Sequence, residues 1–459
     1  MRTLDQILTK KDYSRKTPAS LFYKDSPLWQ KLLTIGCVVF LAGAGLGEWK
    51  PINSAVGGLP KAISLGVIGL AMLYTLFYPD EKRLRELWKP TLLYMSLMAA
   101  LFFWSMVIWI KNFATVSSMI RSCSKLVFQS IAILTAVALV YLFREKAIEL
   151  FTISICIANT AIMLLSIPGY GFAASIQSLV TCLVTFGEAV GYARQLEIHD
   201  LTFVFGQMIL YYAVFAPRTT RQEKRKRWLY LLLCCWFFLV GMKRIAIPAV
   251  VLFVLIALLL RKRKVPSWLY PTVGVCCILF FLAFLYCVRY GVISRLLNSF
   301  GIDMMGRDYL WSMANPYYEF SVTYLGHGFE YVDTIIGQWY SAGLINHPYP
   351  FHNDILKVFV EVGFPGFLLW SSIQYVLTPL FWQRYADQET TLLYLSELGY
   401  MTVTYLTDNT AFYFWSTMAL RLVTLAYAME RKKPPEPKVW MPDSRQEMQD
   451  RIHILMKEV

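Results

Sequence analysis

The chain has 459 residues, of which 57% are hydrophobic and 16% are charged, and its formal net charge is +14. Soluble domains carry about 25% charged residues, and the apolar residues of this chain form uninterrupted blocks. Composition therefore excludes an ordinary soluble protein and predicts an all-α, polytopic membrane protein. The basic residues are scattered through short segments between the apolar blocks, which argues against nucleic-acid binding.

A helix needs about 20 apolar residues to cross the core of a bilayer, and this criterion predicts about twelve transmembrane helices. The stretch 176–186 is too short to cross, and we expect it to form an interfacial or re-entrant helix. The predicted spans lie near residues 30–48, 61–78, 91–110, 126–143, 147–167, 201–216, 228–242, 245–260, 267–288, 363–382, 391–407 and 411–428.

Positive charge orients these spans, because Lys and Arg accumulate in short cytoplasmic loops. With both termini in the cytoplasm, most of the 44 Lys and Arg residues fall in predicted cytoplasmic segments, including the runs 217–227 and 261–264. We expect a membrane-embedded domain at 1–430 and a cytoplasmic tail at 431–459. The basic residues that break this rule are Lys50, Lys61, Lys111, Arg121, Lys125, Arg194, Lys243, Arg244, Arg289, Arg295, Arg307, Lys357 and Arg421.

One long segment, 289–352, separates two predicted spans and is expected to be an extracytoplasmic loop. Loops longer than about 15 residues in a compact domain are commonly functional or disordered. This loop is rich in Trp, Tyr, Phe and Gly, including Gly306-Arg307, Trp311 and Gly326-His327-Gly328. Its composition favours an ordered lid that handles a ligand.

A polar cluster, His352-Asn353-Asp354, ends this loop and precedes the amphipathic run 355–362 and the pair Gly363 and Gly366. An ionisable side chain at a membrane edge is costly to keep there, so it is a candidate functional site. A histidine can take a proton from a hydroxyl near neutral pH. We therefore predict that His352 is a general base.

Two arginines complete the predicted site. Arg244 follows Lys243 between two apolar segments, and Arg307 lies in the long loop. A guanidinium binds phosphate oxygens in a bidentate fork, so both suit a pyrophosphate at the membrane surface. The chain has no Cys/His metal spacing and no phosphate-binding P-loop, so we expect neither a metal nor a nucleotide cofactor.

These residues match a known pattern. The chain resembles the O-antigen polymerase/ligase family from about residue 188 to 421. The matching motifs are Gly241-Met242-Lys243-Arg244, Gly306-Arg307 with Trp311, Gly326-His327-Gly328, and His352-Asn353-x9-Gly363-x2-Gly366.

The resemblance implies ten to fourteen helices and a large extracytoplasmic loop. It also implies that Arg244 and Arg307, with Lys243 beside them, hold the pyrophosphate of an undecaprenyl-linked donor. His352 would be the general base, and Asn353, Trp311, Gly363 and Gly366 would shape the site.

The preferred hypothesis is a Wzy-type glycosyltransferase of the bacterial cytoplasmic membrane. It would join undecaprenyl-pyrophosphate-linked repeat units into O-antigen, capsule or exopolysaccharide on the outer face, with inversion at the anomeric carbon. A flippase and a chain-length regulator would be its partners. Two alternatives stay open: a ligase that moves the glycan to another acceptor, and a flippase or transporter of lipid-linked sugars. The adjacency of His352 and Asn353 favours polymerase over ligase, because it occurs in many capsule and exopolysaccharide polymerases of the family.

Overall fold

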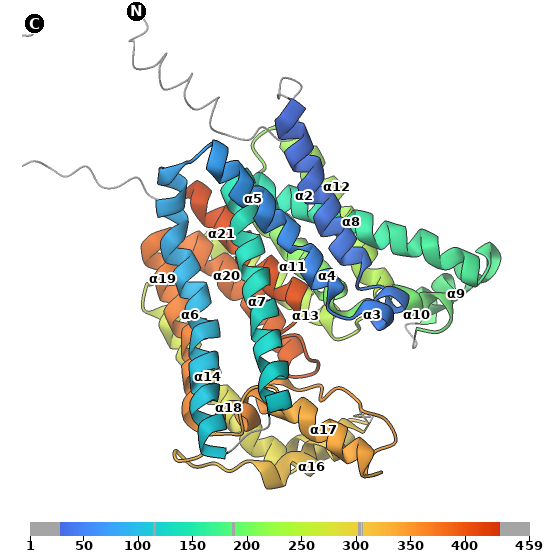
Figure 1. The fold of residues 1–459 in the computed structure, drawn as a ribbon, viewed down its shortest axis with the longest axis vertical. Coiled ribbons are helices and arrows are strands. Elements are labelled where there is room, and N and C mark those ends of the chain that lie inside the picture. The colour runs from blue at the N-terminus through green and yellow to red at the C-terminus, as the bar shows by residue number, and fades with distance from the viewer. Residues whose placement is uncertain (1–27, 113–115, 186–188, 302–303, 305, 432–459) are drawn as a thin grey trace, which may run out of the picture.

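The computed structural model describes residues 28–112, 116–185, 189–301, 304 and 306–431, and all regular structure in these residues is helical. Figure 1 shows a bundle of long helices with a layer of short helices at its lower end, where α6 ends and α7 begins. The predicted all-α class is confirmed. The predicted tail, apart from Arg431, lies outside the described residues, as does the N-terminal segment 1–27.

Six helical runs are long and apolar enough to cross a membrane. The bent pair Lys50–Val56 and Lys61–Phe77 gives a seventh if it counts as one span. This pair is formed by α3 (Lys50–Val56), α4 (Leu59–Ile63) and α5 (Leu65–Phe77). The six runs are α2 (Leu28–Leu46), α6 (Glu81–Asn112), α7 (Val116–Phe143), α8 with a short turn (Lys146–Gly169), α14 (Leu269–Arg289) and α18 with its continuation through α19 (Asp354–Tyr385).

The other predicted spans are also helices, but they are short or carry polar side chains, so the count of twelve stays a prediction. Helices α20 and α21 lie inside the bundle: α21 packs along α7 and α11, and α20 packs along α13 and α21. A helix enclosed by other helices needs no apolar face toward lipid, which accounts for the weaker hydropathy of α20 and α21. Helix α13 and the run Asp200–Phe215 are apolar, but they are shorter than the other spans. The bounds of these helices are α11 (His199–Leu210, continued by a π-helical turn at Tyr211–Phe215), α12 (Arg221–Val240), α13 (Ala246–Arg261), α20 (Gln388–Tyr405) and α21 (Phe414–Arg431).

Helix α9 (Phe172–Thr185) corresponds to the predicted interfacial or re-entrant stretch, and it does not cross the bundle. Ser178 on α9 donates a hydrogen bond to the carbonyl of Val190, and α10 (Tyr192–Leu196) packs against both α9 and the preceding α8. The chain therefore leaves α9 at the end of the bundle where it entered. The direction predicted for every later helix depends on this return.

Basic segments predicted to be cytoplasmic gather at one end of the bundle, which we call the basic end. Lys226 pairs with Glu149 at 2.9 Å, and Arg261 pairs with Glu389 at 2.5 Å. A cavity of about 550 Å³ there is lined by residues of the segments 145–148, 215–219 and 427–431, together with Tyr211 and Arg261. Segments 144–146, 217–227 and 261–264 therefore meet in space, as the charge pattern predicted.

The predicted outer loop folds into short helices at the opposite end (Figure 1). They are α15 (Val292–Ser299), α16 (Arg307–Ala314), a 3-10 turn (Asn315–Tyr317) and α17 (Tyr331–Ser341). Arg289, the last residue of α14, donates to the carbonyl of Tyr318 at 2.7 Å and stacks on its ring at 4.8 Å. These contacts tie the layer of short helices to the bundle.

Candidate active site

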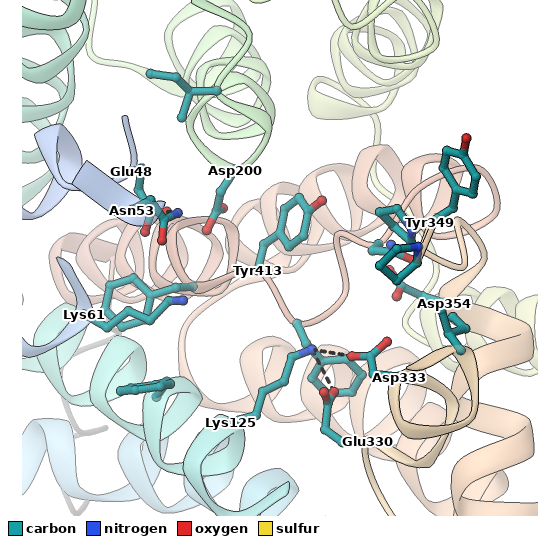
Figure 2. A pocket seen from close by; sticks show the side chains of 18 of the residues that line it. Glu48, Asn53, Lys61, Lys125, Asp200, Glu330, Asp333, Tyr349, Asp354 and Tyr413 are labelled. Carbon is teal, nitrogen blue, oxygen red and sulfur yellow. Dashed lines mark hydrogen bonds and ion pairs between the residues drawn. The ribbon is translucent and has the colours of Figure 1, made fainter. Parts of the chain in front are cut away.

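A cavity of about 1170 Å³ lies at the end of the bundle that carries α17. Figure 2 shows side chains from α4, α7, α11 and α17 and from the turns before α18 and α21 around it. Tyr349 and Tyr413 add aromatic surfaces on which a sugar ring could rest. The charged residues that line it are Glu48, Lys50, Lys61, Arg121, Lys125, Arg194, Glu197, Asp200, Glu330, Asp333, Asp354 and Lys357.

His352 lies next to this cavity and is held by the turn between α20 and α21. Its backbone N–H donates to Asn409 Oδ1 at 2.9 Å, and its Nδ1 lies 3.3 Å from Asp408 Oδ1. A carboxylate only accepts, so this hydrogen bond requires the proton on Nδ1 and leaves Nε2 as the basic nitrogen. No hydrogen bond joins Nε2 to a residue that the structure describes. The backbone of His352 has φ = 53°, a left-handed conformation that only a few per cent of residues other than glycine adopt, with His, Asn and Asp the most frequent.

The two residues after His352 begin α18 and connect it to the same turn. Asn353 is the N-cap, and its Oδ1 accepts from the N–H of Leu356 at 3.0 Å. Asp354 is buried and accepts from the N–H of Ala411 at 2.7 Å, while it also lines the cavity. The cluster predicted from sequence is therefore a joint between α18 and the turn at 407–411.

Gly363 and Gly326 bring the outer segment against α18. Gly363 has φ = 66° and interrupts the helix, and the next N–H, that of Phe364, donates to the carbonyl of Tyr324 at 2.8 Å. A Cβ on Gly363 would lie 2.3 Å from that carbonyl oxygen, and a Cβ on Gly326 would lie 2.4 Å from the carbonyl oxygen of Glu361. Only glycine permits this close crossing of two backbones.

Gly366 and His327 contribute packing near this crossing. A Cβ on Gly366 would meet the indole of Trp104, which donates to the carbonyl of Val362 at 2.7 Å. His327 stacks on Tyr331 with ring centroids 4.2 Å apart, and burial lowers the pKa of His327. His327 is therefore a packed histidine, in contrast to His352.

Lys243 and Arg244 lie in the turn between α12 and α13, on the side of the cavity. Lys243 Nζ forms a 2.8 Å ion pair with Glu197, a residue of the cavity wall. Arg244 is exposed, and neither residue is among those that line the cavity. A Cβ on Gly241 would lie 2.2 Å from Thr202 Oγ1, so this turn is packed tightly against α11.

Arg307 is the first residue of α16, and Trp311 follows one helical turn later. Residues four apart lie on the same side of a helix. The buried indole of Trp311 donates to the carbonyl of Phe351 at 3.0 Å, directly before His352. Arg307 does not line the cavity, but Trp311 fastens its helix to the backbone that carries His352.

A network of charges, which the sequence did not predict, joins three helices at the cavity wall. Lys125 of α7 pairs with Glu330 at 2.7 Å, and Lys357 of α18 pairs with Glu330 at 3.2 Å and with Asp333 of α17 at 2.9 Å. Burial alone would raise the pKa of Asp333, but the ammonium groups of Lys357 and Lys125 outweigh it, so this pKa lies below its usual range. Figure 2 shows Lys125, Glu330 and Asp333 facing one another at the cavity wall.

Sequence reasoning also missed Asp408 and Asn409, although Thr407-Asp408-Asn409 stands out as a polar turn between two apolar segments. That signal gives the position of the turn but not its partner, because His352 is 56 residues away in the chain. The network of Lys125 and Lys357 had a weaker signal. Lys357 and Glu361 are four residues apart and read as an ordinary amphipathic pair.

Comparison with known protein families gives a match over part of the chain. Residues 229–371, from α12 into the last turn of α18, match the family model Wzy_C, described as O-antigen ligase. The matched segment contains Lys243, Arg244, Arg307 and His352. No curated protein matches the chain. The chain therefore carries an O-antigen ligase family domain at residues 229–371, in keeping with a member of the O-antigen polymerase/ligase family.

Proposed function

We propose that this protein is a Wzy-type polymerase that joins undecaprenyl-pyrophosphate-linked repeat units on the outer face of the bacterial cytoplasmic membrane. The observation that carries the proposal is the pair His352–Asp408 beside a large cavity whose lining includes many charged residues. The carboxylate holds the imidazole in the tautomer whose Nε2 is free to accept a proton. The family match supports transfer of lipid-linked glycans in general.

In the proposed reaction, Nε2 of His352 takes the proton of an acceptor hydroxyl. The hydroxyl oxygen attacks the anomeric carbon of the donor glycan from the side opposite the pyrophosphate, and the bond from that carbon to the pyrophosphate oxygen breaks. Direct displacement inverts the configuration at the anomeric carbon. Arg244 and Arg307 neutralise the charge that develops on the departing undecaprenyl pyrophosphate.

The test of the general base is polymerisation by the purified protein from lipid-linked repeat units, without nucleotide. His352→Ala should slow chain growth by about 10²- to 10⁴-fold, the usual contribution of a general base. His347→Ala is the matched control, because His347 lines the cavity beside which His352 lies but forms no hydrogen bond with Asp408. Chain growth by the His352 variant at nearly the normal rate would reduce the motif to a structural element.

Arg307→Lys tests the pyrophosphate contact. The lysine keeps the charge but loses the planar fork, so polymer yield should fall strongly while the protein still inserts and folds. Arg244→Ala should behave in the same way. Wild-type chain lengths from either variant, at normal protein levels, would remove that arginine from the proposal.

The ligase alternative uses the same residues and differs in the acceptor. If the purified protein moves a finished glycan to a lipid or wall acceptor and does not extend lipid-linked repeats, it is a ligase. The transporter alternative requires charges buried within the bundle, and Glu397 and Arg421 are such residues. Both lie outside the matched segment, and the polar residues cluster at one end, so we prefer an enzyme.

A further inference from the structure

Six of the thirteen basic residues that break the positive-inside pattern line one cavity. Lys and Arg normally remain on the cytoplasmic side of a membrane protein, so a group of them on the other side needs a reason. They come from five separate elements, which the fold brings together. The residues of this set that line the cavity are Lys50, Lys61, Arg121, Lys125, Arg194 and Lys357.

These cations fall into two groups. Lys125 and Lys357 are neutralised by Glu330 and Asp333. By contrast, Lys50, Lys61, Arg121 and Arg194 form no ion pair with any residue that the structure describes. The carboxyl of Glu48 lies nearby and feels the charge of Lys61, but it forms no ion pair with Lys61; its oxygens accept hydrogen bonds from Trp415 at 3.3 Å and from Asn53 at 3.3 Å.

Three of these unpaired cations, Lys50, Lys61 and Arg121, belong to one side of the cavity. Lys61 of α4 stands over the ring of Phe128 on α7, with its ammonium 5.4 Å from the ring centroid. Arg121 lies seven residues before Phe128, so it projects from the same face of α7, about 10 Å along the axis. Lys50 is exposed at the start of α3, and Figure 2 shows Lys61 near Glu48 and Asn53.

We propose that Lys50, Lys61 and Arg121 form a second anion site, which holds the diphosphate of the acceptor lipid-linked glycan. The assignment to the acceptor rests on the proposed polymerase function. The site is distinct from the donor site proposed at Arg244 and Arg307. Its residues come from α3, α4 and α7, outside the segment 229–371 that matches the family model.

The cavity is large enough for the headgroup of the acceptor and for the sugars that extend toward His352. Pockets for single drug-sized ligands span about 300–1,000 Å³, and this cavity exceeds that range at about 1170 Å³. Polymerisation needs two lipid-linked glycans at once, each with a diphosphate at the membrane surface. Unpaired cations on the side of α3, α4 and α7 would hold the acceptor while its sugar extends across the cavity toward His352.

A binding experiment without turnover tests the site. Purified full-length protein in nanodiscs is titrated with undecaprenyl diphosphate, which carries no sugar, and the stoichiometry and affinity are measured. We expect two equivalents for the wild type and one for the double variant Lys61→Ala/Arg121→Ala. Each lost charge should weaken affinity at that site by about tenfold or more. Lys111→Ala is the control, because Lys111 is exposed at the same end and does not line the cavity.

Wild-type stoichiometry and affinity in the double variant would overturn the proposal. A second outcome would also overturn it: the double variant binds undecaprenyl diphosphate as the wild type does but no longer binds an acidic repeat-unit oligosaccharide. The cations would then hold sugar carboxylates and not the diphosphate. A fall from two equivalents to one in a protein that does not polymerise would support the anion site and sink the proposed function.

Kinetics test the acceptor assignment. With donor and acceptor varied separately, the double variant should show a KM for acceptor raised about tenfold or more, with the KM for donor unchanged. A raised KM for donor alone would overturn the assignment.

Discussion

A single carboxylate determines which nitrogen of His352 is basic. Asp408 is buried, whereas the His352 side chain is 21% exposed, so the ring is fixed on one side and accessible on the other. The left-handed backbone at His352 is stabilised by the hydrogen bond from its N–H to Asn409. Neighbouring residues of one turn therefore set both the tautomer and the direction of the ring.

Asp408→Asn should lower kcat by about 10² or more, because an amide can donate to the ring and stabilise the wrong tautomer. The KM values for donor and acceptor should change little, since Asp408 is a positioning residue. Asp408→Glu keeps the charge and should restore part of kcat. A variant with normal kcat and raised KM would instead assign Asp408 to substrate binding.

Helix α18 begins after its N-cap, Asn353, and bends at Gly363. Its N-cap, Asn353, places the start of the helix nine residues before the predicted span at 363–382. Lys357 and Glu361 consequently lie within the helix, where they contact protein rather than lipid. The bend at Gly363 then allows the outer segment to cross against it.

Gly363→Ala should destabilise the protein by roughly 1–3 kcal/mol, because alanine is strained at positive φ and its Cβ would overlap the crossing backbone. Gly337→Ala is the matched control. Gly337 lies in α17 with open space around it, so alanine there should be neutral or slightly stabilising. Thermal unfolding in detergent measures both, and equal melting temperatures would contradict the crossing.

The charge network joins α7, α17 and α18, and its contribution to stability should depend on pH. The pKa of Asp333 in the folded protein lies below its usual range. Its contribution is therefore full above about pH 4 and decreases as the pH falls further. Because the Asp333 side chain is 38% exposed, solvent screening keeps the effect small.

The difference in melting temperature between the wild type and Asp333→Asn should thus be larger at about pH 7 than at about pH 3. Asp308→Asn on α16 is the control, because Asp308 forms no ion pair with a described residue. A difference that grows on acidification would show that Asp333 is protonated in the folded protein.

For the whole molecule, the two ends of the bundle have different charge chemistry. The basic end collects the cationic loops, and the opposite end collects the cavity, α17 and the cluster around His352. The return of α9 is the step that places Arg194 at the cavity end. We propose that the basic end faces the cytoplasm.

Cysteine labelling tests this orientation in a variant whose nine native cysteines are replaced. An impermeant maleimide added to intact spheroplasts should label Ser341→Cys and Arg194→Cys. Arg263→Cys at the basic end should react only after permeabilisation. If Arg194→Cys and Arg263→Cys react under the same condition, both lie on the same side of the membrane, and α9 crosses it.

Hydropathy and charge, which act locally along the chain, determined the helical class, most helix positions, the return at 176–186 and the meeting of the basic loops. The sequence also singled out His352 and Trp311. The indole of Trp311 donates a hydrogen bond to the carbonyl of Phe351, the residue directly before His352. Such features follow from the cost of placing polar groups in lipid, so they can be predicted without tertiary contacts.

Only the tertiary structure decided which polar residues share a site. Asp408 lies 56 residues from His352, and Lys125 lies more than 200 residues from its partner Glu330. The contact of the Lys61 ammonium with the ring of Phe128 likewise joins two different helices, α4 and α7. A local pattern sets which side chains leave the lipid, but their pairing depends on how helices distant in sequence pack together, because a charge is stabilised only by the groups that end up within a few ångströms of it.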